Sequence, residues 1–211
     1  MTIALREARD AFETVAADLS AFLDARTDED LLARSRCRGW VVADVLAHLH
    51  LGLSEMITGF AYRVDAPPDT DFLTYWSGYP EPDPDAAVGQ IRFARLLASA
   101  YGRPTGLLDH FRPTLEAVRR FVAQADDGCV RFQGHVLPLG DFVATWVVEI
   151  VVHHLDVLVE LPGPTPDLTL AVRTLDGLRG EGDRPADWDD VTYVLAGSGR
   201  IPGPKGYPLL G

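Results

Sequence analysis

The stretch ATWVVEIVVHHLDVLVEL, residues 144–161, constrains the fold most strongly. It is apolar around most of a helical circumference, which is typical of a helix enclosed by other helices. Glu149 and His153 are four residues apart, so they lie about 40° apart on one helical face. Asp156 and Glu160 extend this polar stripe. The stripe is either the solvated face of a surface helix or a buried Glu–His pair, whose charge would need compensation, for instance by a metal ion.

Composition indicates a globular protein with one substantial core. The chain has 211 residues, 47% of them hydrophobic, and a formal net charge of −12. Nucleic acid and anionic membrane repel so acidic a protein, so neither is an expected partner. No secretory signal is visible, and no run reaches the ~18–20 apolar residues of a spanning helix. We therefore expect a soluble cytoplasmic protein.

Cysteine usage agrees with a reducing compartment. Cys37 and Cys129 are far apart in sequence and form no CxxC pattern. A disulfide framework is therefore not expected, and a metal site built from cysteines alone is excluded.

Periodicity and breakers divide the chain into helices. The pattern predicts helices up to about residue 25, over 40–62 and 86–101, then up to about 125, and over 139–161 and 167–179. Segment 65–85 is a long loop, and 126–138 is an extended linker or a small hairpin. This pattern favours an all-α protein, an antiparallel four-helix bundle over residues 1–163. We expect residues 164–211 to form a short helical extension and a tail that pack on the bundle.

The predicted second helix contains two further histidines, in VLAHLHLG. His48 and His50 are two residues apart, about 200° around a helix, so they cannot face one site together. Periodicity alone does not choose between them, and either is otherwise a core histidine satisfied by one hydrogen bond. Gly52 lies one turn beyond His48 and removes bulk on that face.

At this point the sequence resembles a known family. CRGWVVADVLAHL (37–49) and VVEIVVHHLDVL (147–158) resemble two motifs of mycothiol-dependent maleylpyruvate isomerase-like proteins. These proteins belong to the DinB-like superfamily of metal-binding four-helix bundles. WDDVTYVLAGSGRIP (188–202) resembles a tail segment that ends in Gly-Arg in many members.

The resemblance implies a ligand set for a divalent metal, namely His48, Glu149 and His153. Zn²⁺ is the first candidate, and Ni²⁺, Fe²⁺ and Mn²⁺ also suit imidazole and carboxylate donors. Asp156 matches the acidic position of the family and is expected to orient a ligand histidine. No catalytic residue is expected beyond the metal centre.

Other motif residues are expected to have structural roles. His50 and His154 do not match ligand positions, and we expect His154 to be packed and hydrogen-bonded. Cys37 matches the family cysteine, which by this resemblance is not a nucleophile. Trp40 is expected to anchor the core.

The resemblance further implies an enzyme that uses mycothiol as cosubstrate. Its thiolate would attack a small electrophile, in S-transfer or in cis–trans isomerisation. Family isomerases carry a further C-terminal domain, for which residues 162–211 are too few, so a shorter member such as an S-transferase is favoured. The alternatives are a non-catalytic bundle that binds metal or a small ligand, and a bundle that has lost the metal. We expect small-molecule partners only, and a monomer or homodimer.

The 65–85 loop supplies candidate substrate contacts. Tyr75, Trp76 and Tyr79 would cap the site and bind the electrophile, or else simply tuck onto the bundle. Arg92, Arg95 and Arg103 are weaker candidates for binding a carboxylated ligand.

Overall fold

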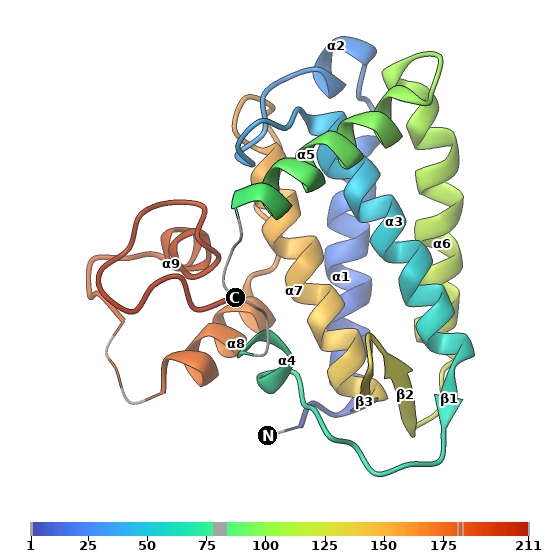
Figure 1. Cartoon of the computed structure of the whole chain (residues 1–211), viewed down its shortest axis with the longest axis vertical. Coiled ribbons are helices and arrows are strands. Elements are labelled where there is room, and N and C mark those ends of the chain that lie inside the picture. The colour runs from blue at the N-terminus through green and yellow to red at the C-terminus, as the bar shows by residue number, and fades with distance from the viewer. Residues whose placement is uncertain (1, 78–83, 181, 183, 211) are drawn as a thin grey trace.

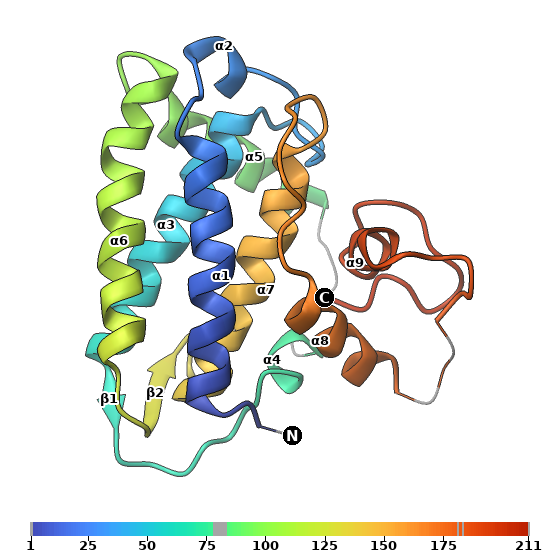
Figure 2. The same ribbon diagram turned by 180° about the vertical axis from the view of Figure 1, so that it is seen from behind.

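Long helices pack side by side in the computed structural model, which describes residues 2–77, 84–180, 182 and 184–210 (Figure 1). They are α1 (Leu5–Leu23), α3 (Val42–Ala61), α6 (Leu108–Gln124) and α7 (Leu139–Val157). α1 and α7 run in one direction, and α3 and α6 run in the other (Figures 1 and 2). The predicted all-α class and DinB-like bundle are confirmed, with antiparallel packing between the two pairs.

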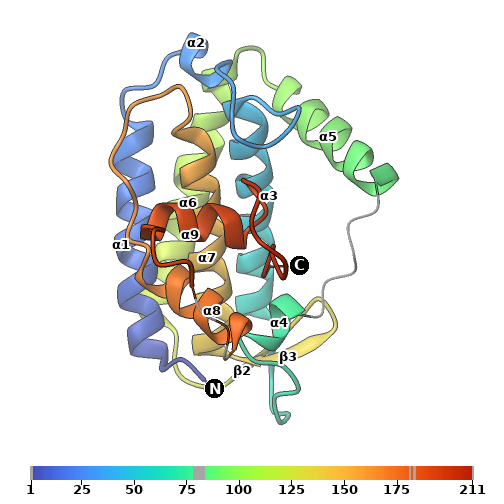
Figure 3. The ribbon, with the colours of Figure 1, turned by 90° about the vertical axis from the view of Figure 1, so that its left-hand side faces the viewer.

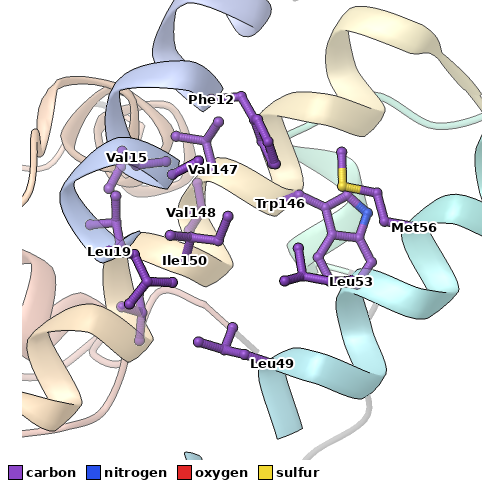
Figure 4. Packing of buried hydrophobic residues seen from close by; sticks show 14 of the residues in the cluster. Phe12, Val15, Leu19, Leu49, Leu53, Met56, Trp146, Val147, Val148 and Ile150 are labelled. Carbon is purple, nitrogen blue, oxygen red and sulfur yellow. The ribbon is translucent and has the colours of Figure 1, made fainter. Parts of the chain in front are cut away.

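The core lies between α1, α3, α6 and α7. Apolar residues of α1 recur at the predicted spacing of three and four, and all of them are buried: Leu5, Ala8, Phe12, Val15, Leu19 and Phe22. Figure 4 shows Phe12, Val15 and Leu19 of this set packed in one cluster with side chains of α7 and α3, among them Val147, Ile150, Leu49 and Leu53. Burial of these side chains drives the association of the helices.

The helix of the polar stripe, α7, is buried on every side. Each of its residues is buried apart from Glu149, whose side chain is 28% exposed. The stripe is therefore not the solvated face of a surface helix. The helix ends at Val157, before the predicted residue 161, so Glu160 lies outside it and pairs with Arg34 on the surface.

A small sheet closes one end of the bundle. β1 (Arg63–Val64), β2 (Cys129–Phe132) and β3 (His135–Pro138) pair antiparallel in that order. The hairpin alternative for segment 126–138 is thus confirmed. Gln133 and Gly134 join β2 to β3 with φ values of 48° and 87°, which suits a two-residue turn between twisted strands.

The connections between the long helices contain short elements. α2 (Asp28–Leu31) lies between α1 and α3, and η1 (Pro104–Leu107) leads into α6. The long loop contains α4 (Thr74–Ser77), which follows the capping side chain of Asp71. α5 (Pro84–Ser99) then packs against α3. The predicted helix over 86–101 is therefore present, with slightly earlier bounds.

The C-terminal extension covers one side of α7. α8 (Thr169–Arg179) and α9 (Asp190–Gly197) both contact α7, and Figure 3 shows them in front of it. α9 falls within the region expected to be a tail and is capped by Asp189, whose carboxylate accepts the Thr192 N–H. The domain division at residue 163 stays a prediction. Among the described residues, no helix has the length and apolar character needed to cross a bilayer.

Candidate metal centre

The residues of the implied ligand set come together between α3 and α7. The donor atoms of His48, Glu149 and His153 all lie within 4.8 Å of one another. His153 Nε2 is 3.4 Å from a carboxylate oxygen of Glu149, one turn away on the same helix. The rings of His48 and His153 have their centroids 4.8 Å apart, edge to face. Periodicity left His48 and His50 open, and the fold places His48 at this cluster.

Close contact between the two helices brings His48 to α7. Gly52, one turn beyond His48, faces the Trp146 indole, and a Cβ on Gly52 would lie 2.7 Å from Trp146 Cζ3. No side chain larger than hydrogen fits there without moving the indole. The His48 ring also packs against Trp40, with ring centroids 5.4 Å apart.

His48 and Glu149 hold the protonation states that metal ligands need. Burial, followed by the nearby charge of His153, lowers the pKa of His48 to about 4, so its imidazole is neutral at pH 7. Burial raises the pKa of Glu149, but its hydrogen bond to His153 and the neighbouring imidazoles outweigh this and keep it below its usual value. A neutral imidazole and an ionised carboxylate are the forms that bind cations.

Asp156 fixes the orientation of His153. Burial opposes protonation of His153, but contacts with Asp156, Cys37 and Glu149 raise its pKa well above the usual value. Its Nδ1 lies 2.9 Å from Asp156 Oδ2, and an ionised carboxylate can only accept, so Nδ1 carries the proton. Nε2 is then the nitrogen that faces Glu149, and a cation bound there would displace the second proton that the raised pKa keeps on the ring.

Two further donors surround Asp156, which is fully buried. Cys37 Sγ lies 3.1 Å from Oδ2, and Arg200 Nε lies 3.1 Å from both carboxylate oxygens. Burial alone would raise the pKa of Asp156, but the His153 hydrogen bond and the Arg200 charge lower it to about 2. Sequence reasoning assigned no role to Arg200, although it is the arginine of the Gly-Arg tail motif.

The remaining histidines lie away from the cluster. His50 lies on the side of α3 that faces α6, and its ring centroid is 6.4 Å from that of Phe111. His154 is fully buried against Phe22 of α1, and burial lowers its pKa to about 4. Neither of its ring nitrogens has a hydrogen-bond partner among the residues that the structure describes. The expected packing of His154 is therefore present, and the expected hydrogen bond is not.

The loop aromatics pack onto the bundle. Tyr75 and Trp76 in α4 are buried and meet edge to face, and Tyr75 Oη donates to Gln133 Oε1 at 3.1 Å. Tyr79 lies outside the described residues. Binding of an electrophile by these side chains stays a prediction. Among the arginine candidates, Arg95 donates a hydrogen bond from Nη2 to the Gly39 carbonyl, and the same nitrogen lies 3.6 Å from Asp44 Oδ2.

The fold and the cluster define a helical bundle that holds a His–Glu–His group between facing helices. Residues 12–158 match the family model described as the mycothiol maleylpyruvate isomerase N-terminal domain, and the chain belongs to this family. The chain also resembles the crystal structure of a histidine-to-alanine mutant of the mycothiol-dependent maleylpyruvate isomerase. That match has a TM-score of 0.54 and 13% identity, and covers 83% of this chain and 70% of the other. No curated protein gives a significant match.

Proposed function

We propose that the protein is a metal-dependent enzyme that uses a low-molecular-weight thiol, mycothiol, against a small electrophile. The observation that carries the proposal is the convergence of His48, Glu149 and His153 within 4.8 Å. Membership of a family named for a mycothiol-dependent isomerase domain supports the choice of thiol. Cytoplasmic location and a monomer or homodimer are part of the same proposal.

The donor set fits a divalent ion. Imidazole nitrogens of His48 and His153 and a carboxylate oxygen of Glu149 would hold such an ion, and three protein donors are the number typical of catalytic sites. Zn²⁺ suits these donors best, and Ni²⁺ or Fe²⁺ are the alternatives. Glu149 is the partly exposed residue of α7, so small molecules would enter from its side.

The side chains of the site hold and orient each participant. When bound, the metal supplies a positive charge that keeps a thiol as thiolate near neutral pH. Asp156 holds the Nδ1 proton of His153, so Nε2 keeps a fixed direction. Trp40 packs against His48 and limits its rotation. These contacts prearrange the site before a substrate arrives.

Two reactions follow from one nucleophile. In both, the thiol releases its proton to solvent, and the sulfur lone pair of the thiolate forms a new bond to an electrophilic carbon. In S-transfer, the leaving group takes the displaced electron pair and the thioether departs. In isomerisation, the thiolate adds to an activated double bond, the resulting single bond rotates, and the double bond reforms as the thiolate leaves.

The test begins with protein purified without chelator or histidine tag. We expect about one equivalent of divalent metal in the wild type, retention in His50→Ala and loss in His48→Ala, because His50 lies on the other face of α3. Metal-loaded protein is then incubated with mycothiol and monobromobimane, or with mycothiol and maleylpyruvate. Enzyme-dependent conjugate or trans product, absent in His48→Ala, supports the proposal. Full metal content without either product would support a non-catalytic binding module instead.

A further inference from the structure

The segment before α3 binds to Asp156 through two separate hydrogen bonds. The Arg36 backbone N–H donates to the Asp156 carbonyl at 2.8 Å. The Cys37 thiol donates to Asp156 Oδ2 at 3.1 Å, and this same oxygen accepts His153 Nδ1 at 2.9 Å. Cys37 and His153 therefore share one carboxylate oxygen, although they are far apart in sequence.

Because Asp156 is fully buried, protein donors rather than bulk water surround its carboxylate. Arg200 Nε lies 3.1 Å from both oxygens, while Cys37 and His153 approach Oδ2. A carboxylate held from several directions has little freedom to rotate. If the Cys37 donor were removed, Oδ2 would lose one of its constraints, and the His153 ring would lose part of its support.

The competing interpretation is a second cation site. Donor atoms of Cys37, His153 and Asp156 also lie within 4.8 Å of one another. However, the Arg200 guanidinium already contacts both oxygens of Asp156, and this fixed positive charge repels a second cation there. The group is therefore better explained as a hydrogen-bond network around His153.

The same short segment also supports His48. Trp40, three residues beyond Cys37, packs against the His48 ring with centroids 5.4 Å apart. Segment 36–40 thus acts on His48 through Trp40, and on His153 both through Asp156 and through the contact between Cys37 and the His153 ring. One loop therefore restricts the side chains of both His48 in α3 and His153 in α7.

We propose that Cys37 is a positioning residue whose thiol, acting through Asp156, holds the His153 ring so that Nε2 faces Glu149 and His48. The inference rests on the proposed function in that it takes His153 as a metal ligand. Cys37 neither reacts with the substrate nor binds the metal in this role.

The test compares Cys37→Ala and Cys37→Val, which cannot donate, with Cys37→Ser, which can. Cys129→Ala in β2 is the matched control, because Cys129 is the other half-buried free cysteine. Affinities for Zn²⁺ and Co²⁺ are measured by chelator competition, Co²⁺ absorption bands report the ligand geometry, and urea unfolding reports the stability of the metal-free proteins. Loss of an outer hydrogen bond to a ligand histidine typically weakens metal binding about 10–100-fold.

We expect at least a tenfold weaker affinity and shifted Co²⁺ bands in Cys37→Ala or Cys37→Val. Cys37→Ser should bind within about threefold of the wild type, and Cys129→Ala should be unchanged. Wild-type affinity in the non-donating variants would overturn the proposal, as would a serine variant as weak as the alanine variant. If Cys37→Ala does not fold, the comparison of valine with serine decides.

The proposed function has separate outcomes. Wild-type protein that binds neither Zn²⁺ nor Co²⁺ would overturn both the function and the role of Cys37. Wild-type protein that binds metal tightly but forms no thiol conjugate would overturn the function alone. The Cys37 comparison would then still stand on its affinities and absorption bands.

Discussion

Arg200 Nε lies 3.1 Å from both carboxylate oxygens of Asp156. This contact joins the segment after α9 to the C-terminal end of α7. Asp156 in turn holds His153 Nδ1 at 2.9 Å. The C-terminal extension is thereby connected to the candidate metal centre through one buried carboxylate. This connection gives the extension a role beyond covering α7.

Asp156→Asn tests this connection. The amide keeps the shape of the side chain, but it leaves Arg200 without its counter-charge and weakens the contact with His153. We expect a loss of roughly 1–3 kcal/mol in the free energy of unfolding, and metal binding weaker by about 10–100-fold. Urea denaturation and chelator competition measure the two effects.

The control is Glu160→Gln, which removes an exposed ion pair with Arg34 near the same end of α7. Exposed pairs contribute less than about 1 kcal/mol, so this variant should resemble the wild type. Equal stability of Asp156→Asn and Glu160→Gln would contradict the role given to Asp156.

Glu149→Gln separates ligand loss from loss of fold. Glu149 is the least buried residue of α7, so the amide is tolerated there, whereas a charged donor to the metal is lost. We expect lower metal content with a helical circular dichroism spectrum close to that of the wild type. An unfolded variant with unchanged metal content per folded molecule would show that Glu149 has a structural role instead.

Gly52→Ala tests the close approach of α3 and α7. Alanine is normally favoured over glycine inside a helix by about 1 kcal/mol. Here the new Cβ would lie 2.7 Å from Trp146 Cζ3, so the indole must move. We expect a net destabilisation of roughly 1–3 kcal/mol in urea unfolding.

Gly89→Ala in α5 is the matched helical control, since a Cβ there meets nothing within 4 Å. It should stabilise the protein slightly or leave it unchanged. If both alanine variants were stabilised alike, the contact between Gly52 and Trp146 would not constrain the helices.

Asp141→Asn tests a pH dependence at the start of α7. Burial raises the pKa of Asp141 from 3.8 to about 6, although its carboxylate accepts the Ile3 N–H at 2.7 Å. A raised carboxyl pKa contributes stability that is present below pH ~4 and lost as pH rises through ~6. The wild type should therefore lose roughly 1–3 kcal/mol relative to Asp141→Asn between pH 4 and 7.

Urea unfolding of both proteins at several pH values measures this difference. The asparagine keeps an oxygen acceptor for Ile3, so the backbone contact is the same in both proteins. Parallel stability profiles over this pH range would show that Asp141 does not titrate with a raised pKa.

Local patterns in the sequence predicted the helices and the polar stripe well. Spacing placed Glu149 and His153 on one face because helical geometry is local. The sequence left open whether this stripe is solvated or buried, and the burial of α7 in the structure decided it. The choice of His48 over His50 required the family resemblance, since periodicity alone allows either to face α7.

Contacts distant in sequence account for what was missed. Cys37 and Arg200 reach Asp156 across 119 and 44 residues, so no spacing rule connects them.

The end of α7 at Val157 was misplaced because apolar residues continue to Leu161 without a strong breaker before Pro162. The short helix α9 lay among glycines and prolines, and only the Asp189 cap marked its start.

The ligand cluster draws on positions 48, 149 and 153, so in an unfolded chain His48 is separated from the other two donors by a long stretch of sequence. An ion that binds the native cluster would therefore shift the unfolding equilibrium by mass action. The melting temperature should then climb with the concentration of free metal, and a chelator should reverse the gain. In this way thermal stability would report the occupancy of the cluster without any knowledge of the substrate.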